Sequence, residues 1–145
     1  AKFRMLFVGD GPDRKRLEER IKENGVSEEC RLLGYVSDKA ELMDIYSAAD
    51  LFLFPSLYDT SSIVQVEAAS HKLAGAFITD SVTAATIKNG KNGFTFDKDG
   101  YSDGVYELLQ NPKKLAEIGE NAFHELYVSW DDVTARVGNY YRKFI

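Results

Sequence analysis

The sequence has few of the residues on which secreted and metal-dependent proteins rely. Among its 145 residues there is one cysteine, Cys30, which excludes an internal disulfide and fits a reducing, cytoplasmic setting. The two histidines, His71 and His124, stand apart without the spacing of metal ligands, so we expect both at a surface or an interface and predict no metal site. No apolar run approaches the roughly 18 residues that a membrane-spanning helix needs.

An excess of basic residues is also missing. The formal net charge is -5, and acidic and basic residues are interspersed without a basic stripe, so we expect no nucleic-acid partner. Charged residues make up 28% and hydrophobic residues 44% of the chain, which is ordinary for a globular protein. The length is that of one domain, and we predict a single domain over residues 1–145.

Apolar runs alternate with helical patterns along the chain. The runs predict strands at residues 5–8, 31–33, 51–54, 76–79 and 93–96. The helical patterns predict helices at residues 13–24, from a capping Ser37 to residues 48–50, at 62–72, from 103 onwards with a break at 111–112, and at 131–144. This alternation predicts an α/β fold with a Rossmann-like parallel sheet and helices on both faces.

Open parallel sheets bind ligands at the carboxyl ends of their strands, and three predicted loops lie at that edge. They are residues 9–12, 55–62 and 79–86. In the middle loop, small polar residues precede a helix whose first N–H groups lack partners within the helix. Those donors and the positive end of the helix dipole form an anion site that needs little basic charge nearby. The loop therefore suits a phosphate group.

Two carboxylates flank this loop. Asp59 lies just before the helix, and Glu67 lies roughly 8 Å along it from Ser62. Carboxylates form paired hydrogen bonds with vicinal hydroxyls, so the spacing suits a ligand built of sugar, diphosphate and ribose. Ordinary structural roles are equally open: Asp59 or Ser61 as a helix cap, Ser62 with Gln65 as a capping box, and Glu67 as a solvated helix residue. Residue chemistry alone does not decide between these possibilities.

Several short groups of residues follow one another in a specific order and spacing. They are Phe7-Val8-Gly9-Asp10-Gly11-Pro12 with Leu17, Leu33-Gly34-Tyr35-Val36, Tyr46-Ser47-Ala48-Ala49-Asp50 running into Leu51-Phe52-Leu53-Phe54-Pro55-Ser56, Val66-Glu67-Ala68-Ala69, and Asn89-Gly90-Lys91-Asn92-Gly93-Phe94. Together they resemble the C-terminal domain of the group 1, or family 4, retaining glycosyltransferases with the GT-B fold. The resemblance covers nearly the whole chain, and the order of the groups is far more specific than any one of them.

The resemblance implies roles for individual residues. The family carries two acidic residues separated by seven others, and Asp59 and Glu67 have that separation. The first acid contacts hydroxyls of the transferred sugar, which makes Asp59 the candidate catalytic residue, and the second binds the nucleotide ribose. The remaining donor-binding candidates are the backbone amides of Ser61, Ser62 and Ile63 for the diphosphate, Gly9 and Gly11 in the glycine loop, and Tyr35 and Val36 in the base pocket.

The sequence also departs from the family pattern. Asp59 is one methylene shorter than the usual Glu, and Ser62 stands where Gly is usual. Lys72 and Ala74 replace the expected Gly and Pro, and Thr83-Ala84-Ala85-Thr86 replaces a glycine-rich segment. We interpret these changes as marks of a subfamily that retains the site.

We interpret the chain as a piece of a longer enzyme. The family's first β–α unit of this domain, with its phosphate-binding Arg and Lys, and the N-terminal acceptor domain would lie before Ala1, so we expect the piece alone to be inactive. The resemblance implies retaining hexosyl transfer from a nucleotide-diphospho-sugar to an acceptor hydroxyl, without a metal cofactor. The acceptor is then a saccharide or a lipid-linked molecule of cell-envelope glycan biosynthesis, and the protein works in the cytoplasm or at the inner membrane face.

Other functions are open on the same scaffold. A nucleotide-sugar 2-epimerase would act on the donor without any acceptor, and a non-catalytic assembly module would keep the fold without binding nucleotide. A nicotinamide site is disfavoured, because Gly9-Asp10-Gly11 begins the dinucleotide fingerprint but Arg14 replaces its third glycine.

Two further groups have open roles. We expect Lys88 and Lys91 to be solvated turn residues, with phosphate contact as the alternative. The aromatic residues near the end of the chain belong either to the core or to an interdomain or self-association surface. The group consists of four aromatic residues and the isoleucine that follows them: Trp130, Tyr140, Tyr141, Phe144 and Ile145.

Overall fold

A computed structural model describes residues 2–59 and 63–144. The chain divides into two compact units, Ala1–Asp44 and Ile45–Ile145, and each is described by itself. All paired strands are parallel and alternate with helices, which confirms the predicted α/β class. That the 145 residues act as one nucleotide-sugar-binding domain stays a prediction.

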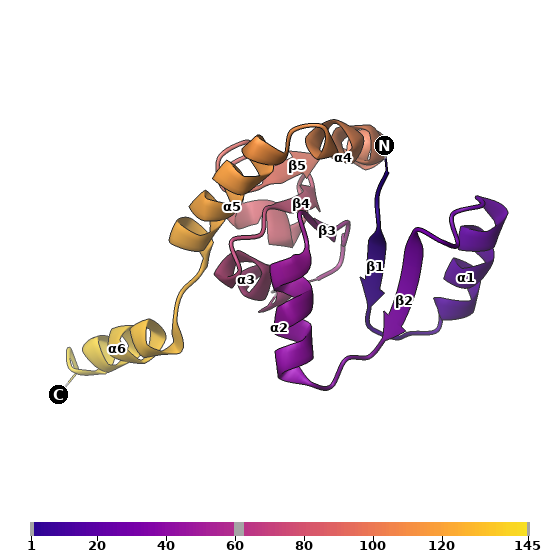
Figure 1. Ribbon diagram of the computed structural model, residues 1–145. Coiled ribbons are helices and arrows are strands. Elements are labelled where there is room, and N and C mark those ends of the chain that lie inside the picture. The colour runs from indigo at the N-terminus through magenta and orange to yellow at the C-terminus, as the bar shows by residue number, and fades with distance from the viewer. Residues whose placement is uncertain (1, 60–62, 145) are drawn as a thin grey trace. The chain divides into compact units, whose positions relative to one another are not determined.

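The first unit is a β–α–β arrangement. Strand β1 (Met5–Val8) pairs with β2 (Cys30–Gly34), and α1 (Arg14–Glu23) connects them (Figure 1). The pairing register shifts between Phe7 and Val8, opposite Gly34, whose φ of 73° is a conformation that glycine adopts readily. Side chains alternate along both strands, and one face leaves Leu6, Val8 and Leu33 exposed.

Helix α2 (Lys39–Ala48) spans the boundary between the units. The prediction that Ser37 caps this helix was wrong by one position, because Asp38 is the cap. The Asp38 carboxylate accepts a hydrogen bond from the Ala40 N–H at 2.8 Å, and the Asp38 carbonyl accepts one from the Leu42 N–H at 3.0 Å. Asp and Ser are equally good caps, so only the exact start of the helix separates them.

The second unit contains a parallel sheet in the order β3–β4–β5. Its strands are β3 (Phe52–Phe54), β4 (Gly75–Ile78) and β5 (Phe94–Phe96). Helix α3 (Ile63–Ser70) lies between β3 and β4 in the chain, and the short 3-10 helix η1 (Val82–Thr86) follows β4. Every residue of the central strand β4 is buried, which explains its unbroken apolar sequence.

The chain continues with mainly helical segments. They are η2 (Lys98–Gly100), α4 (Tyr101–Leu109), α5 (Pro112–Leu126) and α6 (Trp130–Tyr141). The predicted break at residues 111–112 is confirmed, because Pro112 opens α5 and the Asn111 side chain accepts a hydrogen bond from the Lys114 N–H. Among the described residues, no helix combines the length and the apolar character that crossing a membrane requires.

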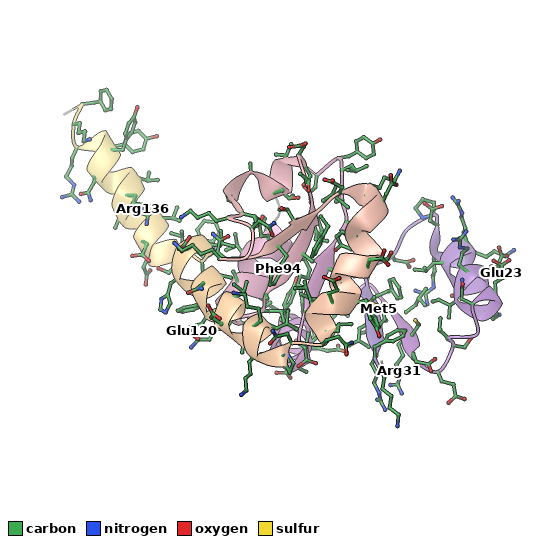
Figure 2. All side chains as sticks on the ribbon, turned by 90° about the horizontal axis from the view of Figure 1, so that it is seen from above. Met5, Glu23, Arg31, Phe94, Glu120 and Arg136 are labelled. Carbon is green, nitrogen blue, oxygen red and sulfur yellow. The ribbon has the colours of Figure 1, made fainter. Side chains whose placement is uncertain are left out.

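The core of the second unit forms between the sheet and helix α5. It centres on the buried residues Ala74, Ala76, Phe94, Leu115 and Ile118. Figure 2 shows Phe94 among closely packed side chains, whereas Glu120 lies at the margin on α5. Full burial of a side chain such as Ile118 stabilises the fold by about 1.5–3 kcal/mol, so this layer holds the sheet against α5.

Helix α6 contributes nothing to this core. None of its residues is buried, all of them being described, and Trp130 is 81% exposed. Tyr140, Tyr141 and Phe144 are exposed as well. Core packing, one of the two expectations for these aromatic residues, is therefore wrong. Ile145 lies outside the described residues.

Candidate functional site

The carboxyl ends of β3 and β4 bring two of the predicted loops to one edge of the sheet. Because β3 and β4 pair in parallel, the segment after Phe54 and the segment after Ile78 leave the sheet on the same side. The second segment turns sharply at Asp80, whose φ is 61°, and Ser81 then caps η1 by accepting a hydrogen bond from the Ala84 N–H. The third loop, residues 9–12, follows β1 in the first unit.

The start of α3 is open to solvent in its described part. Ile63, the first residue of the helix, is 72% exposed, and Tyr58 on the loop before it is exposed too. Asp59, between them in sequence, is half-buried. The predicted phosphate-binding amides of Ser61 and Ser62 lie outside the described residues, whereas Ile63 lies within them.

Glu67 is anchored on the second turn of α3. It is half-buried, and its Oε2 accepts a hydrogen bond from the Tyr46 hydroxyl at 3.3 Å. Tyr46 itself is only 8% exposed. Burial, then the nearby Glu67 charge and this hydrogen bond, raise the pKa of Tyr46 to about 12, so the phenol stays protonated and donates at neutral pH. The alternative of a simply solvated Glu67 is wrong.

His71 packs against both Tyr46 and Glu67. Its ring stacks on Tyr46 with centroids 5.9 Å apart, and its Nδ1 lies 3.0 Å from the Glu67 carbonyl oxygen. Phe52 meets the Tyr46 ring edge to face with centroids 6.1 Å apart. These contacts fix the Tyr46 ring from the turn after α3 and from β3. Sequence reasoning gave Tyr46 no role at the site because Tyr46 lies 21 residues before Glu67, on the helix before β3.

A groove of about 590 Å³ adjoins the start of α3 in the second unit. Ile63, Val66 and Val82 form its apolar part, and Asn92 and Glu125 lie at its polar part. Asn92 is 2% exposed and ties the loop to α5, because its amide donates to Glu125 Oε2 at 3.1 Å and its Oδ1 accepts from the Lys88 N–H.

The two turn lysines are exposed and also pair with an acidic residue of α5. Lys88 Nζ lies 2.8 Å and Lys91 Nζ lies 2.5 Å from carboxylate oxygens of Glu125. Hydrogen bonds from Lys88 and then Lys91 lower the pKa of Glu125 to about 2. Both lysines are exposed, as expected of solvated turn residues, and both also pair with Glu125; phosphate contact by either stays untested. Glu125 is 33 residues from Asn92 in the chain, so no local pattern indicated the pairing.

Gly9 and Gly11 line a groove of about 640 Å³ in the first unit, whereas Tyr35 and Val36 are not among its lining residues. Gly9 has a φ of 117°, and its N–H donates to the Gly34 carbonyl at 2.7 Å. The Gly11 N–H donates a hydrogen bond to the Asp10 carboxylate at 2.9 Å. Arg14, which stands where the fingerprint has its third glycine, donates a hydrogen bond to the Leu32 carbonyl at 3.4 Å.

Tyr35 and Val36, the predicted base-pocket residues, directly follow β2. Tyr35 is 80% exposed and Val36 is half-buried. Their roles, like those of Gly9 and Gly11, stay predictions. No group of three or more potential metal ligands occurs among the described residues.

Comparison with known proteins places the chain in a family. The family model described as "Glycosyl transferases group 1" matches residues 1–125. Mannosylfructose-phosphate synthase of Agrobacterium fabrum is 42% identical over 149 residues, covering 94% of this chain and 32% of that protein. Alpha-monoglucosyldiacylglycerol synthase of Acholeplasma laidlawii is 33% identical over 120 residues, covering 82% of this chain and 30% of that protein. The chain thus spans under a third of each of these two relatives.

Solved structures confirm the fold. Sucrose-phosphate synthase from Thermosynechococcus elongatus matches with a TM-score of 0.80 at 21% identity, over 96% of this chain and 38% of that one. HepE from Anabaena in complex with UDP-glucose matches with a TM-score of 0.74 at 21% identity, over 93% of this chain and 40% of that one. Because the family model covers most of its residues, this chain belongs to the group 1 glycosyltransferases.

Proposed function

We propose that the protein containing this chain transfers a hexosyl group from a nucleotide-diphospho-sugar to an acceptor hydroxyl, with retention at the anomeric carbon. The observation that carries the proposal is the half-buried Glu67 carboxylate, held by Tyr46 beside an exposed helix start at the carboxyl edge of a parallel sheet. That edge is where open α/β sheets bind nucleotides. The named activities of the two relatives, both synthases that form glycosides, support the same reaction class.

In this proposal, the second unit holds three parts of the donor. Glu67 accepts hydrogen bonds from the ribose hydroxyls, and the backbone amides of Ser61, Ser62 and Ile63 donate to the diphosphate. Asp59 accepts hydrogen bonds from hydroxyls of the transferred sugar. In the first unit, Gly9, Gly11, Tyr35 and Val36 are proposed donor contacts on the strength of the family resemblance.

The proposed chemistry is a front-face displacement. The bond between the anomeric carbon and the diphosphate oxygen breaks, the diphosphate leaves with the electron pair, and the acceptor oxygen bonds to the same face of the carbon. The departing diphosphate accepts the proton of the acceptor hydroxyl. The protein's contribution is then electrostatic, because fixed N–H donors stabilise the charge that grows on the leaving group. The acceptor, a saccharide or a lipid-linked molecule, contacts parts outside these residues.

Calorimetry with UDP-, GDP- and ADP-sugars, using the full-length protein, tests donor binding. We expect one base to bind clearly more tightly than the other two, and binding to persist in the presence of a metal chelator. If none of the three sugar nucleotides binds, the proposal is wrong.

A Glu67→Ala change should weaken binding of the cognate nucleoside diphosphate by about 1–3 kcal/mol, because charged hydrogen bonds to the ribose are lost. The measurement is a dissociation constant in the full-length protein. Glu107→Ala, which removes an exposed acid on α4, is the matched control and should bind as the unmodified protein does. Equal affinities of the Glu67→Ala variant and its control would contradict the ribose role.

An Asp59→Ala change should lower turnover far more than it lowers affinity for the nucleoside diphosphate. The reason is that the diphosphate and ribose lack the hexosyl hydroxyls that Asp59 is proposed to hold. Steady-state kinetics and calorimetry on the same variant separate the two effects. Parallel loss of both would assign Asp59 a structural role.

A further inference from the structure

Tyr46 connects helix α2, which has no proposed contact with the donor, to the Glu67 carboxylate, which is proposed to bind the ribose of the donor. Tyr46 belongs to α2 and Glu67 to α3, and the two residues are 21 positions apart. The hydroxyl donates to Oε2 of Glu67 only, at 3.3 Å. Within the described part of the chain, Oε1 of Glu67 receives no hydrogen bond.

The Tyr46 ring is held by its neighbours independently of that hydrogen bond. His71 stacks on it at an interplanar angle of 26°, and Phe52 meets it edge to face at 67°. Aromatic contacts of these two kinds favour one ring orientation, and 8% exposure leaves little room for another. The hydroxyl is therefore a fixed donor that exists before any ligand binds.

We propose that Tyr46 is a positioning residue that holds the Glu67 carboxylate in the orientation in which it binds the nucleotide ribose. This inference rests on the proposed function. A glutamate side chain has several rotatable bonds, and a ligand that must order it loses part of its binding free energy. A hydrogen bond to Oε2 restricts the carboxylate beforehand and leaves Oε1 for a ribose hydroxyl.

The length of the hydrogen bond sets the size of the effect. At 3.3 Å it is longer than the roughly 2.7–2.8 Å usual between two oxygens, so it orients the carboxylate without competing strongly for it. We expect its loss to weaken ribose recognition by about 3- to 10-fold, which is the range of an ordinary hydrogen bond and less than that of a short bond to a charged group.

The test compares affinities of the full-length protein for the cognate ribonucleoside diphosphate and its 2′-deoxy analogue. The unmodified protein should prefer the ribonucleotide, and Tyr46→Phe should reduce that preference by about 3- to 10-fold while keeping the ring and its packing. Turnover at saturating donor should stay within about twofold, because the change removes ground-state binding of the ribose.

Tyr101 provides a matched control. Its hydroxyl is also half-buried and donates to the Ala76 carbonyl at 2.8 Å, and burial raises its pKa to about 12 as for Tyr46. Tyr101→Phe should lower the unfolding temperature yet leave the ribose preference unchanged. An equal drop of the preference in both variants would reduce Tyr46 to a structural residue and overturn the inference.

A double variant separates this inference from the proposed function. On a Glu67→Ala background, Tyr46→Phe should cause no further loss of ribose preference, because the carboxylate that it orients is gone. If Glu67→Ala removes the preference and Tyr46→Phe alone does not reduce it, the positioning role fails and the ribose role of Glu67 stands. If Glu67→Ala leaves the preference intact, the ribose role itself fails.

Discussion

At the scale of single residues, Lys72 shows how a departure from the family pattern affects the fold. Its φ is 57°, in the left-handed region that favours glycine, which is the residue that the family resemblance leads us to expect there. The side chain offers partial compensation, because Nζ pairs with the Glu120 carboxylate at 2.9 Å and lies 5.5 Å from the Phe123 ring centroid. The lysine therefore carries a backbone cost and links the end of α3 to α5.

Replacing Lys72 by glycine and by alanine separates these two contributions. Both changes remove the ion pair, but only glycine relieves the backbone, so we expect Lys72→Gly to be more stable than Lys72→Ala by about 1 kcal/mol. Equilibrium denaturation by urea measures both. A more stable alanine variant would contradict a cost at this φ.

The sequence singles out the acidic pair by its local spacing and by the family resemblance, whereas it gives no sign of the residues that contact Glu67 from elsewhere in the chain. Asp59 and Glu67 lie within one loop and the helix that follows it, where spacing carries information. Tyr46 contacts Glu67 from another helix, and Asn92 contacts Glu125 across 33 residues. Such pairs form only when tertiary packing brings elements together, so a single sequence carries no local signal of them.

At the scale of elements, α5 approaches the turn before β4 unusually closely. A Cβ added to Gly119 would lie 1.9 Å from the Lys72 carbonyl oxygen and 3.2 Å from the Ala74 nitrogen. Both neighbours are backbone atoms that cannot rotate away. Gly119 therefore permits the contact between the helix and the chain leading into the central strand.

Gly119→Ala should destabilise the protein by about 1–3 kcal/mol, because overpacking outweighs the gain in helix propensity. Gly138→Ala is the control on α6, where an added Cβ would meet only an Arg142 side-chain atom at 4.0 Å. That change should be neutral or stabilise by up to about 1 kcal/mol. Thermal unfolding of the two variants compares them, and equal melting temperatures would contradict the close approach.

Strand and helix positions were predicted well because their patterns are local. The five strands and the break before Pro112 were confirmed to within a few residues. The errors came where alternatives have equal local energies, as at Ser37 and Asp38 before α2. The exposure of the aromatic residues in and after α6 could not be derived from sequence, because an aromatic stripe suits a core and an interface equally.

At the scale of the whole molecule, the response to acid depends on which carboxylates are paired. The chain is acidic, with a net charge of -5, so protonation of its carboxylates below neutral pH changes its charge substantially. Glu125 joins the loop of Lys88, Lys91 and Asn92 to α5 and is the acid with a strongly lowered pKa among those described. Protonation of this one group therefore loosens a link between the edge of the sheet and the helix that covers it.

The direction of the effect follows from the two pKa values of Glu125, about 2 in the folded protein and 4.5 in the unfolded chain. Because the folded pKa is the lower one, the pair stabilises the protein fully above pH 4.5 and loses its contribution as pH falls towards 2. The unmodified protein should melt at a higher temperature than Glu125→Gln at pH 7, and this difference should shrink steadily between about pH 5 and pH 3. Added salt should also narrow this difference in melting temperature, since the lysines are exposed.

Glu117→Gln, at an exposed acid on the same helix, should show a smaller difference from the unmodified protein, because the contact of Glu117 with Lys114 is long, at 3.8 Å. A melting difference for Glu125→Gln that is independent of pH would assign Glu125 to packing rather than to charge.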